Sequence, residues 1–527
     1  MNISIFLMSG LFMSLMLLLW MFPYFNVSFY FLEWNLISLD YMLNFNNLLF
    51  AFILFLVSFS VFVFSTYYLN SELNFNYYYF VLLIFILSMF MLNFSSSPIS
   101  MIISWDLLGI SSFFLVLFYN NWDSCSGSMN TVLTNRLGDY FMFIFFSGAL
   151  IGCFSMVDHS FFSGYLGFLL IATAATKSAQ FPFSGWLPKA MSAPTPVSSL
   201  VHSSTLVTAG LILMMNFFDL VMHENMSKVI LIVGIFTMFF SSITALVEED
   251  LKKVVALSTL SQMGFATVTL GLGLYYISFL HLVSHALFKS CLFMQVGYII
   301  HCSFGQQDGR GYSNNGNMPN FIQLQLLVTL FCLCGLIFSS GAVSKDFILE
   351  MFFSGGYMMF LSLMFFITIF LTFGYSYRLW KSLFLSFNKL VNHYSSSVFM
   401  NFLSLFLVMF SIFFMWWLNF NMLNIPALFL YVDFFSPLTY IFIMLFLSFL
   451  LVKLLFKELT YKFLVDYLAK NSILKMKNFK FIDNYLNSMI QLLSKNLSFF
   501  SLSSNYYMKS LNFNSVVFLT MMIFLLL

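Results

Sequence analysis

The stretch 169–183 reads LLIATAATKSAQFPF and contains the feature on which the fold depends. It belongs to an apolar run that is long enough to cross a membrane, yet Lys177 lies inside the run and Pro182 follows it. A charged side chain at the centre of a bilayer costs about 2.5–3.5 kcal/mol on insertion scales. Proline breaks helices because it lacks an N–H donor and clashes with the preceding turn. The stretch therefore predicts a membrane helix that ends beside a buried lysine.

The whole chain has the composition of a membrane protein. Of its 527 residues, 61% are hydrophobic and 8% are charged, whereas a soluble domain is about 25% charged. Apolar segments of about 20 residues recur along the chain, and a helix of that length crosses a bilayer. The segments are continuous rather than alternating, which favours helices over a β-barrel. The net charge of +2 is too small to suggest nucleic-acid binding.

These segments predict an all-α polytopic membrane protein with about 15 transmembrane helices. The segment 181–197 holds four of the nine prolines, so we expect the helix that carries Lys177 to be broken there. Such a break is tolerated at membrane depth only where protein or a water-filled cavity surrounds it. The predicted spans are 3–22, 43–68, 77–95, 98–119, 132–157, 161–181, 194–216, 228–248, 252–273, 276–300, 320–343, 357–380, 399–419, 437–456 and 514–527.

Residues 453–496 have a different pattern. Lysines are interspersed with apolar residues that recur every three or four positions, which predicts an amphipathic helix lying along the membrane surface. A last short span would hold its far end in the membrane. The predicted organisation is N-terminal transmembrane helices at 1–97, a core at 98–385, further transmembrane helices at 386–452, the lateral amphipathic helix at 453–500 and a terminal anchor at 501–527.

Few ionisable residues remain inside the predicted spans. Buried ionisable residues in membranes usually mark ion or proton paths. His281, His285 and Lys289 are spaced at i, i+4 and i+8, so they share one stripe of a helix. The candidate site residues are Asp106, Lys177, His202, His281, His285, Lys289 and Lys345, with Arg136, Asp139, Asp250, Lys253 and Asp346 as secondary candidates.

These residue types are suited to proton transfer. A lysine amine that is removed from water can release its proton near neutrality because desolvation disfavours the charged form. Histidine titrates in the same range. A carboxylate favours the protonated amine when it is close and favours proton release when it is distant. We therefore predict that Lys177 is a titratable station in a proton path.

The charged residues allow two other interpretations. The charges could pair and satisfy helix ends without moving protons, most of all Arg136 with Asp139 and Asp250 with Lys253. The HxxxH spacing can ligate zinc, but HLVSH at 281–285 lacks the Glu of HExxH and no third ligand is evident. The six cysteines show no metal or haem spacing, and neither GxGxxG nor a Walker sequence is present. We therefore expect no metal, cofactor or redox site in this chain.

Six segments resemble the antiporter-like proton-translocating subunits of respiratory complex I. They occur in the family's order between residues 104 and 350, and the longest is highly specific. The segments are SWDLLGISSF (104–113), NRLGDYF (135–141), KSAQFPFSGWLPKAMSAPTPVSSLVHSSTLVTAG (177–210), EDLKKVVALSTLSQMGF (249–265), HLVSHALFKSCLFM (281–294) and SKDFILE (344–350).

This resemblance implies a core of two inverted five-helix repeats, each with a broken helix and a central lysine. Lys177 would serve the first repeat and Lys345 the second, with Lys289 and the three histidines of the candidate set between them. Asp106, which stands where many members have Glu, would take the position of the carboxylate that faces Lys177.

The resemblance also implies a function. The chain would translocate protons across the inner mitochondrial membrane, coupled to NADH oxidation and ubiquinone reduction. NADH, FMN, iron–sulfur clusters and ubiquinone would be bound by other subunits of the complex. The helix at 453–496 would run along neighbouring antiporter-like subunits, with membrane lipids as the other partners. The alternatives are a subunit of an Mrp-type cation/proton antiporter, which shares these motifs, and a structural membrane arm that does not pump protons.

Overall fold

The computed structural model describes the larger part of the first of two compact units, Met1–Leu445 and Phe446–Leu527. The described residues are 27–34, 37–70, 72–154, 159–312, 320–335, 340–341, 344–345, 348, 359–385, 404 and 406–413. The predictions for the spans 3–22, 437–456 and 514–527, for the lateral helix at 453–500, for the anchor at 501–527 and for Asp346 lie outside them.

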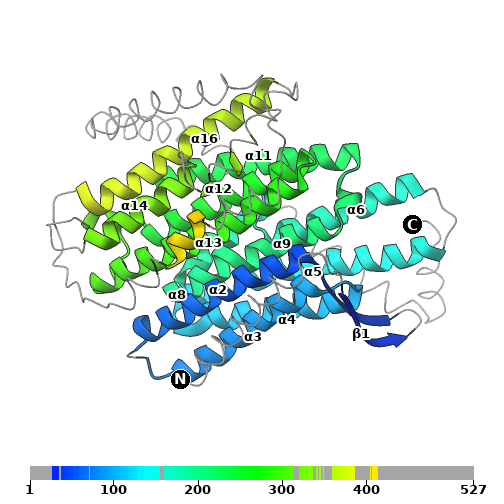
Figure 1. Cartoon of the computed structure of the whole chain (residues 1–527), viewed down its shortest axis with the longest axis horizontal. Coiled ribbons are helices and arrows are strands. Elements are labelled where there is room, and N and C mark those ends of the chain that lie inside the picture. Colours follow the sequence, from blue (N-terminus) through cyan, green and yellow to red (C-terminus); the bar gives the residue numbers. More distant parts are fainter. Residues whose placement is uncertain are drawn as a thin grey trace, which may run out of the picture. The chain divides into compact units, whose positions relative to one another are not determined.

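Helices form most of the described chain (Figure 1). Within the described residues, eight helical segments are long and apolar enough to cross a membrane, which confirms the helical membrane architecture. The helices are α2 (Phe45–Tyr68), α3 (Phe75–Phe94), α4 (Pro98–Val116), α5 (Trp122–Phe154), α6 (His159–Lys177), α7 (Trp186–Lys189), α8 (Thr195–Leu200), α9 (Leu206–Asn216), α10 (Phe218–Val221), α11 (Glu224–Val247), α12 (Leu251–Gly271), α13 (Tyr275–Cys302), α14 (Asn320–Cys334) and α16 (Met359–Trp380).

Several short elements join these helices. Two are π-helical turns, in which the backbone hydrogen bonds skip one residue more than in an α-helix. The short elements are the 3₁₀ turns η1 (Leu117–Tyr119), η2 (Phe183–Gly185), η3 (Ala190–Ser192) and η5 (Gly309–Gly311), and the π-helices η4 (Val201–Thr205) and η6 (Lys381–Leu385).

Helix α5 begins ten residues before the predicted span at 132–157. Its first turns carry Ser124, Ser128 and Thr131, which lower the hydropathy of this stretch. All three side chains are buried, and each hydroxyl donates a hydrogen bond to a backbone carbonyl three residues earlier. A polar helical turn is stable at this place because protein encloses it, and hydropathy alone does not detect such a turn.

A β-hairpin, which the sequence analysis did not predict, precedes the helices. Strand β1 (Val27–Trp34) pairs antiparallel with β2 (Ile37–Leu43). The hairpin is attached to the turn between α3 and α4, where the Ser100 hydroxyl donates to the Asp40 carbonyl and the Asp40 N–H donates to the Ser97 hydroxyl. Ser97 also accepts from the Ser100 N–H as the N-cap of α4, and Pro98 opens that helix. This cap fixes the start of the helix that carries Trp105 and Asp106.

Close helix contacts surround the end of α6. A Cβ atom at Gly138 on α5 would lie 2.0 Å from the Thr176 hydroxyl oxygen, and one at Gly210 on α9 would lie 2.4 Å from the Ala174 carbonyl oxygen. Small residues let membrane helices approach each other closely. Helices α5 and α9 therefore press against the last turn of α6, next to Lys177.

Replacing Gly138 tests this packing. We expect Gly138→Ala to lower the free energy of unfolding by about 1–3 kcal/mol, because its Cβ would overlap Thr176. Gly109→Ala on α4 is the matched control, since no atom lies within 4 Å of the added Cβ. Thermal unfolding of the detergent-solubilised protein measures both variants. Equal stability of the two would contradict the close contact.

Candidate functional site

Lys177 is the last residue of α6, so the predicted helix break is confirmed. Residues 178–194 follow as turns and the short elements η2, α7 and η3, and a regular helix resumes at Thr195. The Lys177 side chain is fully buried. The carboxyl end of a helix carries partial negative charge, which favours a cation at this position.

Trp105 of α4 contacts the amine of Lys177 through both its carbonyl group and its indole ring. The amine donates a hydrogen bond of 2.7 Å to the Trp105 carbonyl oxygen. The same nitrogen lies 3.7 Å from the centre of the indole ring, which is a cation–π contact. The indole Nε1 donates in turn to Asp139 Oδ1 at 2.9 Å. Trp105 therefore links the buried lysine to a carboxylate on α5.

The two carboxylates share one arginine. Arg136 lies 3.0 Å from Asp139 Oδ2 and 3.4 Å from Asp106 Oδ1, and the first contact confirms the predicted pair on one helix face. The Asp139 side chain is 8% exposed and that of Asp106 is 33% exposed. Within the described residues, no hydrogen bond or ion pair joins Lys177 directly to either carboxylate. The structure places Asp106, which the resemblance puts opposite Lys177, against Arg136.

His202 lies in the π-helical turn η4, between α8 and α9. Its ring is fully buried and lies 6.0 Å from the ring of Trp186, whose indole donates to the Thr176 carbonyl. Neither ring nitrogen has a hydrogen-bond partner within the described chain. π-Helical turns occur frequently at functional sites.

Helix α13 carries His281, His285 and Lys289 on one buried face, as predicted. The Lys289 amine donates to the Ser258 hydroxyl on α12 at 2.5 Å. His281 Nε2 lies 3.2 Å from the Gln262 carbonyl oxygen, also on α12, and Nδ1 lies 2.8 Å from the Ser344 hydroxyl.

His285 lies between these two residues on α13. Its ring is fully buried, and the backbone of Ser203 in η4 lies beside it. Among the described residues, no group of three or more His, Cys, Asp or Glu side chains is arranged to hold a metal ion.

The amine of Lys345 binds the end of a second helix. Its amine donates to the Leu333 carbonyl at 2.7 Å and to the Cys334 carbonyl at 3.1 Å, at the C-terminus of α14. It also lies 5.2 Å from the centre of the Phe265 ring. Helix α14 ends earlier than the predicted span at 320–343, because Gly335 adopts a left-handed conformation with φ of +73°. The sequence analysis did not identify Gly335 as the residue at which this helix ends.

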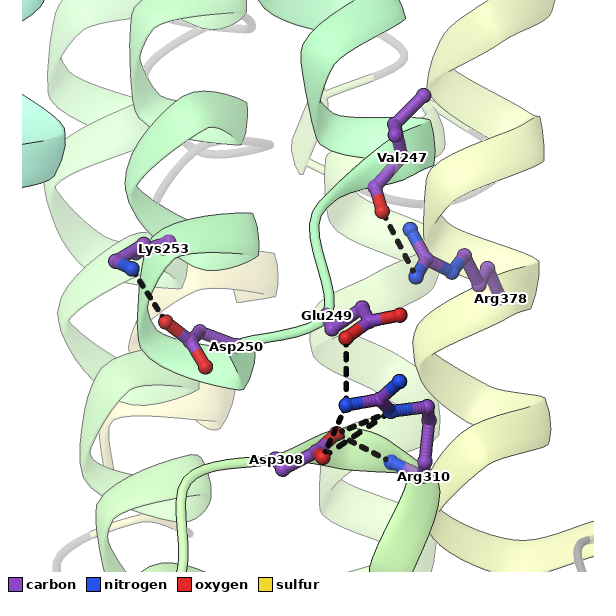
Figure 2. A network of polar contacts seen from close by, with 7 residues as sticks. All are labelled: Val247, Glu249, Asp250, Lys253, Asp308, Arg310 and Arg378. Atoms are coloured by element: carbon purple, nitrogen blue, oxygen red, sulfur yellow. Dashed lines mark hydrogen bonds and ion pairs between the residues drawn. The ribbon is translucent and has the colours of Figure 1, made fainter. Parts of the chain in front are cut away.

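A third polar group lies at the turn between α11 and α12 (Figure 2). Lys253 and Asp250 form the predicted ion pair at 2.5 Å, with side chains that are 42% and 34% exposed. Arg310 pairs with Glu249 at 2.6 Å and with Asp308 at 2.7 Å.

Arg378 of α16 binds the end of α11 beside this turn (Figure 2). Its guanidinium donates to the carbonyl groups of Leu246, Ala245 and Val247, the last three residues of α11. These contacts satisfy carbonyl groups that have no partner within the helix. Arg378 therefore stabilises the end of α11, and the Lys253–Asp250 pair stabilises the start of α12. These residues and Arg310 do not contact the buried candidate residues within the described chain.

The sequence analysis missed several residues that contact the candidate site. Trp105 directly precedes Asp106 in a quoted segment, but its contacts with residues on α5 and α6 leave no trace in local spacing. On α12 a local pattern was available, because Ser258, Ser261 and Gln262 recur at helical spacing within an apolar helix. This spacing could have identified the polar face that contacts the candidate site.

The two ion pairs spaced at i, i+3 should differ in energy. We expect Arg136→Met to lower the free energy of unfolding by about 1–2 kcal/mol, because Asp139 is only 8% exposed and loses its counter-charge, while solvent at the 44% exposed Arg136 screens part of the interaction. Lys253→Met should change it by less than about 1 kcal/mol, because that pair is exposed. Denaturant unfolding of the solubilised protein measures both changes, and similar values for both would contradict the assignment.

Comparisons with known proteins agree with the quoted segments. The family model described as NADH:quinone oxidoreductase/Mrp antiporter, transmembrane, matches residues 95–372. The chain is 72% identical over 526 residues to NADH-ubiquinone oxidoreductase chain 5 of Caenorhabditis elegans, covering 100% of both chains. It is 63% identical to the protein of the same name from Ascaris suum, covering 100% of this chain and 96% of that one.

Two solved structures show the same fold. A chain of the Mrp complex from Dietzia sp. matches with a TM-score of 0.68 and 24% identity, over 76% of this chain and 46% of that chain. A chain of the membrane-bound sulfane sulfur reductase, an archaeal respiratory membrane complex, also matches with a TM-score of 0.68, at 19% identity over 78% of this chain and 71% of that chain. Together with the matches in sequence, these findings show that the chain belongs to the NADH:quinone oxidoreductase/Mrp antiporter transmembrane family.

Proposed function

We propose that this chain is a proton-translocating membrane-arm subunit of respiratory complex I in the inner mitochondrial membrane. Relatives that match its whole length at 72% and 63% identity are named as chain 5 of NADH-ubiquinone oxidoreductase. The observation that carries the proton-translocating role is the set of buried ionisable side chains on α6, η4 and α13 and at the end of α14. Lysine and histidine are able to exchange protons when the membrane interior encloses them.

The contacts of these residues support proton transfer over a purely structural role. Lys289 and His281 are hydrogen-bonded to hydroxyl groups, which can both donate and accept a proton. His202 keeps both ring nitrogens clear of protein partners within the described residues. Buried imidazole groups with a purely structural role are normally hydrogen-bonded. The His202 ring is therefore suited to exchange protons with mobile donors such as water.

Redox chemistry belongs to other subunits in this proposal. NADH, FMN, iron–sulfur clusters and ubiquinone would be bound elsewhere in the complex, and this chain would use the free energy of their reaction. Neighbouring antiporter-like subunits would pack along the amphipathic segment 453–496. The second candidate, a subunit of a cation/proton antiporter, rests on the shared fold with a chain of the Mrp complex.

Native gel electrophoresis of solubilised membranes distinguishes the two candidates. We expect the chain to migrate with a band that stains for NADH dehydrogenase activity, because its relatives are named as part of that enzyme. Mass spectrometry of the band identifies the chain. Migration in a smaller assembly without this activity would favour the antiporter, and sodium-dependent proton exchange would then be the measurement.

Replacing Lys177 tests the proton-translocating role. We expect Lys177→Met to lower coupled proton transfer roughly tenfold or more, because a positioned acid–base group is lost. Lys228→Met is the matched control, since Lys228 is exposed on α11. The measurements are the ratio of protons moved to NADH oxidised in sealed membranes and the amount of assembled complex. An unchanged ratio for Lys177→Met would favour the structural membrane arm.

A further inference from the structure

Trp105 makes three polar contacts from one side chain and its own carbonyl group. It lies on α4, its side chain is 1% exposed, and it directly precedes Asp106 in the sequence. Its carbonyl accepts from Lys177, its ring face lies 3.7 Å from the same amine, and its indole N–H donates to Asp139. None of the predicted proton-path residues contacts both Lys177 and a carboxylate in this way within the described chain.

The ring face responds to the charge of the lysine. The face of an indole is negative, so it attracts an ammonium group, and this attraction is largest when water is excluded. A neutral amine has no such attraction. The carbonyl of Trp105 likewise forms its stronger hydrogen bond with a charged donor. Trp105 therefore stabilises the protonated lysine at the position seen in the structure.

The indole N–H extends this arrangement to α5. Asp139 accepts from Trp105 through Oδ1 and from Arg136 through Oδ2, so both carboxylate oxygens have partners. The indole lies between the amine and the carboxylate and contacts both groups. A displacement of the ring would therefore change the surroundings of Lys177 and Asp139 together.

The second lysine has a related but simpler arrangement. Lys345 also donates to backbone carbonyls, and its amine lies 5.2 Å from the centre of the Phe265 ring. Trp105 lies on α4, the second of the consecutive long helices α3, α4, α5 and α6, and Phe265 lies on α12, the second of α11, α12, α13 and α14. An aromatic ring thus contacts the lysine in each half, but phenylalanine has no N–H group. Among the described residues, the link to a carboxylate through an indole N–H occurs at Lys177 and not at Lys345.

We propose that Trp105 is a positioning residue of the proton site at Lys177. Its ring face and carbonyl hold the protonated amine, and its indole N–H holds Asp139, so that the lysine and the carboxylate act as one unit. This inference rests on the proposed function, because it assigns Trp105 a role in proton transfer at Lys177.

Substitutions at position 105 separate the two contacts. Trp105→Phe keeps a ring face and loses the N–H donor, and we expect coupled proton transfer to fall about threefold. Trp105→Leu loses both contacts, and we expect a decrease on the order of tenfold. The measurement is the ratio of protons moved to NADH oxidised in sealed membranes, with assembly checked on a native gel. A purely space-filling role would give the same order but leave the pH profile of coupled proton transfer unchanged, whereas in Trp105→Phe the loss of the N–H donor to Asp139 shifts that profile.

Trp380→Phe and Trp380→Leu are the controls, because Trp380 packs on Phe384 at the end of α16 and has no polar contact with the candidate site within the described part of the chain. Both controls should keep the parent ratio. The ratio of protons moved to NADH oxidised should fall from the parent to Trp105→Phe and again to Trp105→Leu. Any other order of this ratio would overturn the proposal.

If Trp105→Leu does not assemble, Trp105→Phe decides alone: a several-fold decrease supports the proposal, and the parent ratio overturns it. Lys177→Met is measured alongside. A normal ratio in Lys177→Met would refute the proposed function itself, whereas an impaired Lys177→Met with normal Trp105 variants would refute this inference only.

Discussion

The cost of enclosing a lysine amine in a membrane protein shapes the rest of this structure. Such an amine needs acceptors, because an ammonium group without partners is strongly disfavoured away from water. The amines of Lys177 and Lys345 both donate to backbone carbonyls, and the second binds the carbonyls at the end of an interrupted helix. Each of these lysine amines therefore lies beside the end of an interrupted helix. The close contacts at Gly138 and Gly210 exist because the backbone beside Lys177 must be enclosed by protein.

Sequence spacing cannot distinguish an ion pair with a buried carboxylate from one that is exposed on both sides. Arg136–Asp139 and Lys253–Asp250 both join residues three apart on one helix. The first pair lies mid-helix beside Trp105 and shares its arginine with Asp106, whereas the second lies at the start of α12. The difference arises from helices that are distant in the sequence. The charged residues alone therefore left both a functional and a structural interpretation possible.

The features that could be predicted depend on local sequence, and those that could not depend on tertiary contacts. Apolar run length located the spans, prolines located the break after Lys177, and helical spacing placed His281, His285 and Lys289 on one face. The contact of Trp105 with Lys177 joins residues 72 positions apart, so no local pattern reports it. The hairpin at 27–43 was missed because it has neither the length nor the continuity of a membrane span.

The contacts of Arg378 have a consequence for the synthesis of the chain. The carbonyl of Ala245 at the end of α11 accepts from a residue 133 positions later. Chains emerge from the ribosome in order, and early segments wait for later ones. The turn after α11 therefore gains its final hydrogen bonds only when α16 has entered the membrane, which makes the closing of this turn a late event in biogenesis.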